Sequence, residues 1–130
     1  MTLPAVKLAD IAVPADSVPG VSADATVREA FELAKQCGSD ELPVRSLGTH
    51  EVVGIFDAYN AILKFDEADW ENFPVSACMS GLHVLLETDD VSRAVDVARH
   101  DRVPLFVIAD RFGRQTGLLS PDRIAELLFR

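Results

Sequence analysis

The chain contains few histidine and cysteine side chains that could bind a transition metal, and they are scattered along the sequence. The histidines are His50, His83 and His100, and the cysteines are Cys37 and Cys78. A zinc site needs three or four ligands, and the one pair close in sequence, Cys78 with His83, supplies only two. We therefore expect no metal site, and we interpret both cysteines as small buried hydrophobic residues in a reduced protein.

The sequence also gives no sign that the groups required for enzyme chemistry come together. Catalysis by a nucleophile needs a base and an oxyanion donor that converge on the same atom. Ser120 is followed by Pro121, and no histidine lies near it in the sequence. Gly48, Gly54 and Gly81 are isolated, so no glycine-rich phosphate loop is present. We therefore expect that the chain is not an enzyme.

The composition is that of a compact acidic protein. The chain has 130 residues, of which 48% are hydrophobic, and this is typical of one folded unit with its own core. The formal net charge of −9 disfavours binding to nucleic acids and to anionic membranes. No apolar run approaches the roughly 20 residues that span a bilayer, and no secretory signal is visible. We expect a cytoplasmic protein.

Two short charged segments have simple interpretations. The acidic cluster Asp66, Glu67, Asp69 and Glu71 is expected to be a solvated face of a linker. The segment Arg111-Phe112-Gly113-Arg114 is a small basic spot, which we interpret as a solvated hairpin turn.

An internal repeat is the most informative pattern in the chain. Residues 27–34 and 91–98 carry the same apolar stripe at spacing i, i+3, i+4, i+7, which is typical of a half-buried helix. The stripes lie 64 positions apart, and residues 52–56 match residues 115–119 at an offset of 63. Each copy must bury its apolar face, and we expect the other copy to cover it.

The first copy is predicted to alternate strands and helices. A helix is expected over about 26–37, with Thr26 or Asp24 as its cap and Gly38 as its stop. A strand starts at 42–44 and a second runs over 51–56, and a helix capped by Asp57 follows through residue 63. Residues 1–20, with three prolines, are expected to have little regular structure. In the connector 65–75, Trp70 and its neighbouring aromatics are expected to pack onto the domain.

The second copy is predicted to follow the same order. It comprises a short buried strand at 84–86, a helix over about 90–100, strands at 105–109 and 115–119, and a last helix. Ser120 caps that helix and Pro121 occupies its first position. The last helix, which runs to Phe129, is mostly apolar and must be covered by the first copy or by a second chain. Each copy thus implies a small three-stranded sheet with helices.

With this repeat, the sequence resembles a tandem CBS-domain pair, also called a Bateman module. The resemblance rests on the lead-in and helix 22–30, on Leu42-Pro43-Val44 with its looser partner 103–107, on the strand ends 54–57 and 117–120, and on the linker 74–80. It implies an α+β fold in which two repeats are related by a pseudo-twofold axis. The repeats are expected at 1–65, with the lead-in, and at 76–130, joined by the connector 66–75.

The resemblance also implies candidate ligand-binding residues. In this family the cleft between the repeats often binds an adenine nucleotide or a related adenosyl ligand. A hydroxyl after the glycine-containing strand meets phosphate together with the helix N-terminus, and an acid or amide three positions later meets the ribose. These two positions hold Asp57 and Asn60 in the first copy and Ser120 and Arg123 in the second. The remaining candidates are Asp122, one position early, and Gly81, His83 and Leu85 beside the first strand of the second copy.

The motif is incomplete in both copies. A carboxylate at Asp57 would repel phosphate, whereas Asn60 could still hold a ribose. Arg123 stands where an acid or amide belongs and could contact phosphate instead. Plain helix capping is the alternative interpretation for Asp57 and Ser120, and ordinary packing is the alternative for His83.

Two functions remain open at the level of sequence. The first is a stand-alone regulatory module that senses an AMP-like or S-adenosylmethionine-like ligand and acts in trans on a partner protein, because 130 residues include no enzyme or transporter domain to regulate. The second is a ligand-free module for dimerisation or protein docking. In either case we expect a homodimer, because one small chain can hardly cover its apolar helix faces.

Overall fold

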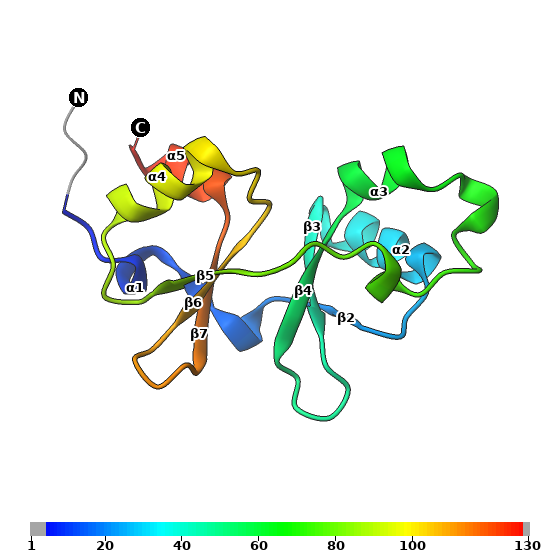
Figure 1. Ribbon diagram of the computed structural model, residues 1–130, viewed down its shortest axis with the longest axis horizontal. Coiled ribbons are helices and arrows are strands. Elements are labelled where there is room, and N and C mark those ends of the chain that lie inside the picture. Colours follow the sequence, from blue (N-terminus) through cyan, green and yellow to red (C-terminus); the bar gives the residue numbers. More distant parts are fainter. Residues whose placement is uncertain (1–4, 129–130) are drawn as a thin grey trace. The chain divides into compact units, whose positions relative to one another are not determined.

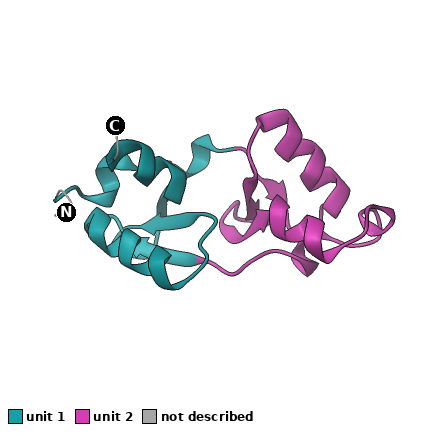
Figure 2. Ribbon diagram, turned by 90° about the horizontal axis from the view of Figure 1, so that it is seen from above, with its two compact units in different colours: residues 1–18, 83–130 teal, residues 19–82 magenta. Residues whose placement is uncertain are grey.

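The computed structural model describes residues 5–128 and shows two compact units of mixed helix and sheet (Figure 1). Unit 1 combines residues 1–18 with residues 83–130, and unit 2 comprises residues 19–82 (Figure 2). Both units contain the order strand, helix, strand, strand, helix that the repeat predicts.

Unit 2 is formed around the first copy of the repeat. Its elements are β2 (Val21–Ser22), α2 (Val27–Cys37), β3 (Glu41–Arg45), β4 (Val52–Asp57) and α3 (Ala58–Lys64). The sheet order is β2-β3-β4, with β2 parallel and β4 antiparallel to β3. The apolar stripe of α2 packs on the sheet, and the buried core of the unit includes Val27, Ala30, Ala34, Leu42, Val44, Phe56 and Val75.

Local sequence signals set both ends of α2. The Thr26 hydroxyl accepts a hydrogen bond from the backbone N–H of Glu29 at 3.1 Å, and the Glu29 side chain reaches back to the N–H of Thr26. This reciprocal capping box satisfies backbone donors that the first helical turn leaves free. At the other end Gly38 adopts a left-handed conformation with φ 64°, which ends the helix. The expected cap and stop are both confirmed.

The connector after α3 packs onto unit 2 through its aromatic side chains. It contains the short 3₁₀ turns Glu67–Asp69 and Val75–Ala77. The Trp70 ring stacks on Phe31 of α2 with 4.1 Å between centroids, which confirms the expected packing of Trp70 onto the domain. Arg28 binds Glu71 at 2.8 Å and lies 5.5 Å from the Trp70 ring. The acidic cluster thus contributes one ion pair, while Asp66 and Glu67 are solvent-exposed and Asp69 is half-buried.

Unit 1 is formed around the second copy, with the lead-in added to it. Its repeat elements are β5 (His83–Leu86), α4 (Val91–His100), β6 (Phe106–Ala109), β7 (Gln115–Leu119) and α5 (Pro121–Leu128). The lead-in contributes α1 (Leu8–Ile11), β1 (Val13–Pro14) and the 3₁₀ turn Ala15–Ser17. Val13 of β1 pairs with Leu118 of β7, so the lead-in adds an edge strand to the three strands of the copy. The resulting four-stranded sheet has the order β1-β7-β6-β5. Its core includes Leu8, Val91, Ala94, Phe106, Ile108, Leu119 and Ile124.

Each unit is completed by the segment that precedes the other copy of the repeat. In unit 1 the backbone N–H of Val91 donates to Val6, and Leu8 donates back to Asp89. In unit 2 the N–H of Val27 donates to Phe73, and Val75 donates back to Ala25. Leu8 and Val75, the apolar residues of these two segments, are both fully buried.

A glycine in each unit allows these segments to cross closely. A side chain at Gly54 would meet the sulfur of Met79 at 2.5 Å, and one at Gly117 would meet the Cβ of Ala12 at 2.9 Å. The matching glycine-containing strands that reveal the repeat in the sequence therefore have a packing function.

Several local expectations are wrong. The lead-in contains regular structure because its backbone pairs with unit 1, despite its prolines. Cys37 is exposed at the end of α2, whereas Cys78 is buried. In β5 only Leu85 is buried, because alternate side chains of a strand face opposite sides. The expectation that a second chain covers the apolar last helix stays a prediction: within the single chain α5 buries Ile124, and Phe129 lies outside the described residues.

Candidate ligand-binding site

Three of the candidate positions gather at one end of the sheet in unit 1. His83 begins β5 and lies opposite Phe106 of β6, which in turn lies opposite Leu119 of β7. Ser120 follows Leu119 directly and leads into α5. Because neighbouring strands are about 4.8 Å apart, His83 and the end of β7 are separated by roughly 10 Å across the sheet.

Ser120 acts as the cap of α5. Its Oγ accepts a hydrogen bond from the backbone N–H of Arg123 at 3.2 Å, and Pro121 is the first helical residue. The predicted cap and the predicted proline position are therefore confirmed. The hydroxyl keeps a second lone pair and its own proton, so this contact leaves it able to bind a ligand as well.

Arg123 joins α5 to the lead-in. Its Nε donates to the carbonyl oxygen of Ile11 at 2.9 Å. This contact fixes the base of the guanidinium group and uses one of its five N–H donors. Sequence reasoning did not anticipate this contact, because Ile11 and Arg123 are distant along the chain and only the docked lead-in brings them together.

His83 is half-buried and lies near an acidic neighbour. Its Nε2 is 3.8 Å from a carboxylate oxygen of Asp101, which follows α4. Its Nδ1 is buried without a hydrogen-bond partner among the residues that the structure describes. The structure thus shows a partly packed histidine with one ring nitrogen that can still make a hydrogen bond.

The other candidates of this group are less favourably placed. Leu85 is buried in the core of unit 1, so its side chain supports the sheet from the helical side. Asp122 is exposed in the first turn of α5. Gly81 is exposed and belongs to unit 2, and a side chain there would meet nothing within 4 Å.

In unit 2, Asp57 is the buried charged residue of the described core, with 5% of its surface exposed. One carboxylate oxygen accepts a hydrogen bond from the backbone N–H of Asn60 at 3.4 Å, which caps α3 as predicted. Asn60 itself is exposed. A buried carboxylate already occupies the start of α3, where it would oppose an incoming phosphate.

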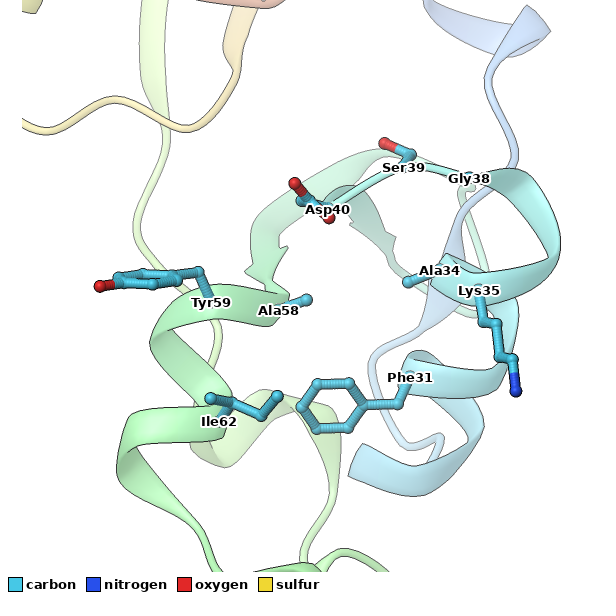
Figure 3. Close-up of a pocket in the computed structure, with 9 residues that line it drawn as sticks. All are labelled: Phe31, Ala34, Lys35, Gly38, Ser39, Asp40, Ala58, Tyr59 and Ile62. Carbon is cyan, nitrogen blue, oxygen red and sulfur yellow. The ribbon is translucent and has the colours of Figure 1, made fainter.

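Unit 2 also contains a pocket that the sequence did not reveal. It has a volume of about 490 Å³ and lies between the end of α2 and the start of α3. Phe31 of α2 and Ile62 of α3 point toward one another in it (Figure 3), and Ala34, Lys35 and Tyr59 also line it. Ser39 and Asp40 close the remaining side. Sequence patterns could not indicate it, because its walls come from two helices that the strands β3 and β4 separate.

Two further properties concern only residues 5–128. No three metal-binding side chains of the histidine, cysteine or carboxylate type come together in that range. No helix there has the length and apolar character needed to cross a membrane.

The topology of the two units is that of a tandem CBS-domain pair, and the α+β class predicted from the sequence is confirmed. No protein-family model matches the chain. Among solved structures, the chain is similar to the CBS domain of a bacterial CNNM/CorC family Mg²⁺ transporter in complex with ATP. The TM-score is 0.83 at 19% identity, covering 95% of this chain and 87% of that one.

One further solved structure and one sequence relative are also similar to the chain. CBSX2 in complex with AMP has a TM-score of 0.75 at 16% identity, covering 94% of this chain and 95% of that one. In sequence, the chain is 25% identical over 122 residues to the magnesium and cobalt efflux protein CorC of Salmonella typhimurium. That alignment covers 94% of this chain and 41% of CorC, so the chain spans about two fifths of that relative.

Proposed function

We propose that the chain is a regulatory module that binds an adenosyl ligand and acts in trans on a partner protein. The observation that carries this proposal is that His83 and Ser120 lie at the same end of the sheet of unit 1, with Arg123 in the first turn of the helix that Ser120 caps. The similar structures that contain ATP and AMP support the choice of ligand class.

The chemistry of this end of the sheet suits a ligand with few phosphates. The start of α5 carries the positive end of a helix dipole, and Arg123 adds a cationic group within one turn. Asp57 removes favourable charge from the corresponding position of unit 2, and the net charge of −9 opposes polyphosphates at long range. We therefore expect AMP, or a cationic nucleoside such as S-adenosylmethionine, to bind more tightly than ATP.

A thermal-shift panel of ATP, ADP, AMP, S-adenosylmethionine and NAD identifies the best ligand, and calorimetry then gives its affinity. A ligand at about 100 times its dissociation constant stabilises the native state by roughly 2.7 kcal/mol, which such a panel detects. ATP binding about tenfold or more tightly than AMP would contradict the charge argument. Absence of any shift across the panel would overturn the ligand proposal.

Substitutions locate the site. Ser120→Ala combined with Arg123→Ala should weaken an anionic ligand, whereas Asp57→Ser should strengthen binding in unit 2. The matched control is Ser92→Ala combined with Arg93→Ala, because these exposed residues of α4 give the same change in composition and charge. Equal affinity of the wild-type protein and the three variants would show that the ligand binds elsewhere.

One observation supports a homodimer, and it is compatible with the alternative function of a ligand-free module for dimerisation or docking. The short helix α3 exposes Tyr59, Ile62 and Leu63, with 61%, 56% and 70% of their surfaces accessible, beside the pocket of unit 2. We propose that a second copy of the chain covers this helix in a homodimer. A monomeric mass by light scattering at micromolar concentrations would exclude this arrangement.

We also propose that the protein is cytoplasmic. Cys37 and Cys78 are both free thiols in the structure, which is the usual state of cysteines in a reducing compartment. Isolation of the native protein with its thiols blocked, followed by mass spectrometry, tests this: an oxidised Cys37 in the resting cell would contradict it.

A further inference from the structure

The hairpin turn between β6 and β7 presents an aromatic ring to solvent. Phe112, in this turn, has 68% of its surface exposed. The guanidinium carbon of Arg111 lies 4.8 Å from the ring centroid, and that of Arg114 lies 5.6 Å from it. Both distances are within the range of cation–π contacts. The hairpin is the orange segment at the end of β6 and β7 in Figure 1.

Hydrogen bonds within the turn fix its backbone conformation and thereby the positions of these side chains. One Asp110 carboxylate oxygen accepts hydrogen bonds from the backbone N–H groups of Phe112 and Arg114, both at 2.9 Å. Gly113 adopts φ 82° and donates its N–H to the Asp110 carbonyl at 3.0 Å. A turn that is ordered before binding loses little further conformational freedom when a partner arrives.

The charged side chains of the turn differ in whether they have an ion-pair partner. The Asp110 carboxylate pairs with Arg114 at 3.4 Å in addition to accepting the two backbone hydrogen bonds. Arg111, by contrast, has no carboxylate partner within the described part of the chain, and its contact is with the Phe112 ring. In a protein of net charge −9, an unpaired guanidinium on an exposed ring marks a local site for an acidic group.

A small pocket adjoins the exposed ring. It has a volume of about 200 Å³, lies where β5 and β6 end, and is lined by Leu86, Glu87, Thr88, Asp110, Arg111 and Phe112. Leu86 is 45% exposed and provides an apolar wall. The Glu87 carboxylate accepts a hydrogen bond from the Thr116 hydroxyl at 3.3 Å. The pocket thus offers apolar surface next to the unpaired guanidinium of Arg111.

We propose that this surface, residues 110–114 together with Leu86, docks an acidic segment of a partner protein that carries an apolar anchor residue. Aromatic and arginine side chains dominate the binding energy of protein interfaces, especially beside a pocket that one partner residue can fill. A carboxylate of the partner would pair with Arg111 while its apolar residue contacts Phe112 and Leu86.

The acidic connector of a second copy of the chain is a poorer occupant. Its aromatic residue, Trp70, already stacks on Phe31, and its Glu71 already pairs with Arg28. This inference rests on the proposed function, because the surface would make the contact with the partner protein that the module regulates. The docking itself requires no adenosyl ligand. The two proposals can therefore fail independently.

The test is selection of a random peptide library on the full chain in nucleotide-free buffer, followed by titration of the best synthetic peptide. We expect the selected peptides to combine Asp or Glu with an adjacent Leu, Ile, Phe or Trp. Phe112→Ala and Arg111→Glu should each weaken binding about tenfold or more. Raising the salt concentration from about 50 to about 300 mM should also weaken it.

Leu47→Ala is the matched control. Leu47 is also 68% exposed and lies in the corresponding hairpin turn of unit 2, whose sequence Ser46-Leu47-Gly48-Thr49-His50 contains no arginine. Its substitution should leave peptide affinity unchanged, and Phe112→Ala should leave the circular dichroism spectrum and the adenosyl titration unchanged.

Three outcomes would overturn the proposal. The first is a selection that gives no peptide, or gives peptides without acidic residues. The second is equal binding of the selected peptide to the wild-type and Phe112→Ala proteins. The third is Arg111-dependent binding to heparin or to anionic vesicles without peptide binding, which would identify the turn as a general site for anionic polymers or membranes.

Discussion

Leu8 should be a major contributor to the stability of unit 1, although it precedes β5, the first strand of the second copy, by more than seventy positions. Its side chain is fully buried in the core, and its backbone N–H donates to Asp89 at 2.9 Å. Leu8→Ala removes three carbon atoms from this core, with a transfer cost of about 2.4 kcal/mol. The remaining cavity raises the expected loss of unfolding free energy to roughly 3–4 kcal/mol.

Urea denaturation followed by circular dichroism measures this loss. The fluorescence of Trp70, the single tryptophan, reports separately on unit 2, because its ring stacks on Phe31. The control, Leu47→Ala, removes the same atoms from an exposed turn and should change the free energy of unfolding by less than about 0.5 kcal/mol. A loss below about 1 kcal/mol for Leu8→Ala would refute the conclusion that the lead-in is part of the core of unit 1.

Three further outcomes are expected. Thr26→Ala should lower the unfolding free energy by about 1 kcal/mol in urea denaturation, because it removes the side-chain cap of α2; an unchanged midpoint would contradict this role. Gly117→Ala should cost about 1–3 kcal/mol because its new methyl group would meet Ala12 at 2.9 Å, and calorimetry would show a lower melting temperature. Burial raises the pKa of the Cys78 thiol, so Cys78 forms less thiolate at a given pH than an ordinary cysteine. A thiol reagent at mildly alkaline pH should therefore label the exposed Cys37 first. Equal labelling rates would argue against the burial of Cys78.

The sequence alone was sufficient for the order of elements within each copy of the repeat and for the class of fold. The apolar stripe of α2, its Thr26 cap and its Gly38 stop are local signals, and local backbone chemistry determines where such a helix begins and ends. The same holds for Ser120 and Pro121 at the start of α5. Because the apolar stripe and the glycine-containing strand occur twice at nearly the same spacing, they also indicated two copies of one structural unit.

Tertiary structure decided which segments complete each copy and which side chains reach the surface. The pairing of Val13 with Leu118, and the contact of Arg123 with Ile11, join residues about a hundred positions apart, and no periodicity in the sequence specifies such pairs. Burial of Cys78 but not of Cys37 likewise depends on what packs against each residue. The physical reason is that helix caps and apolar stripes depend on interactions within a few residues, whereas docking and burial depend on contacts that form only once the whole chain has folded.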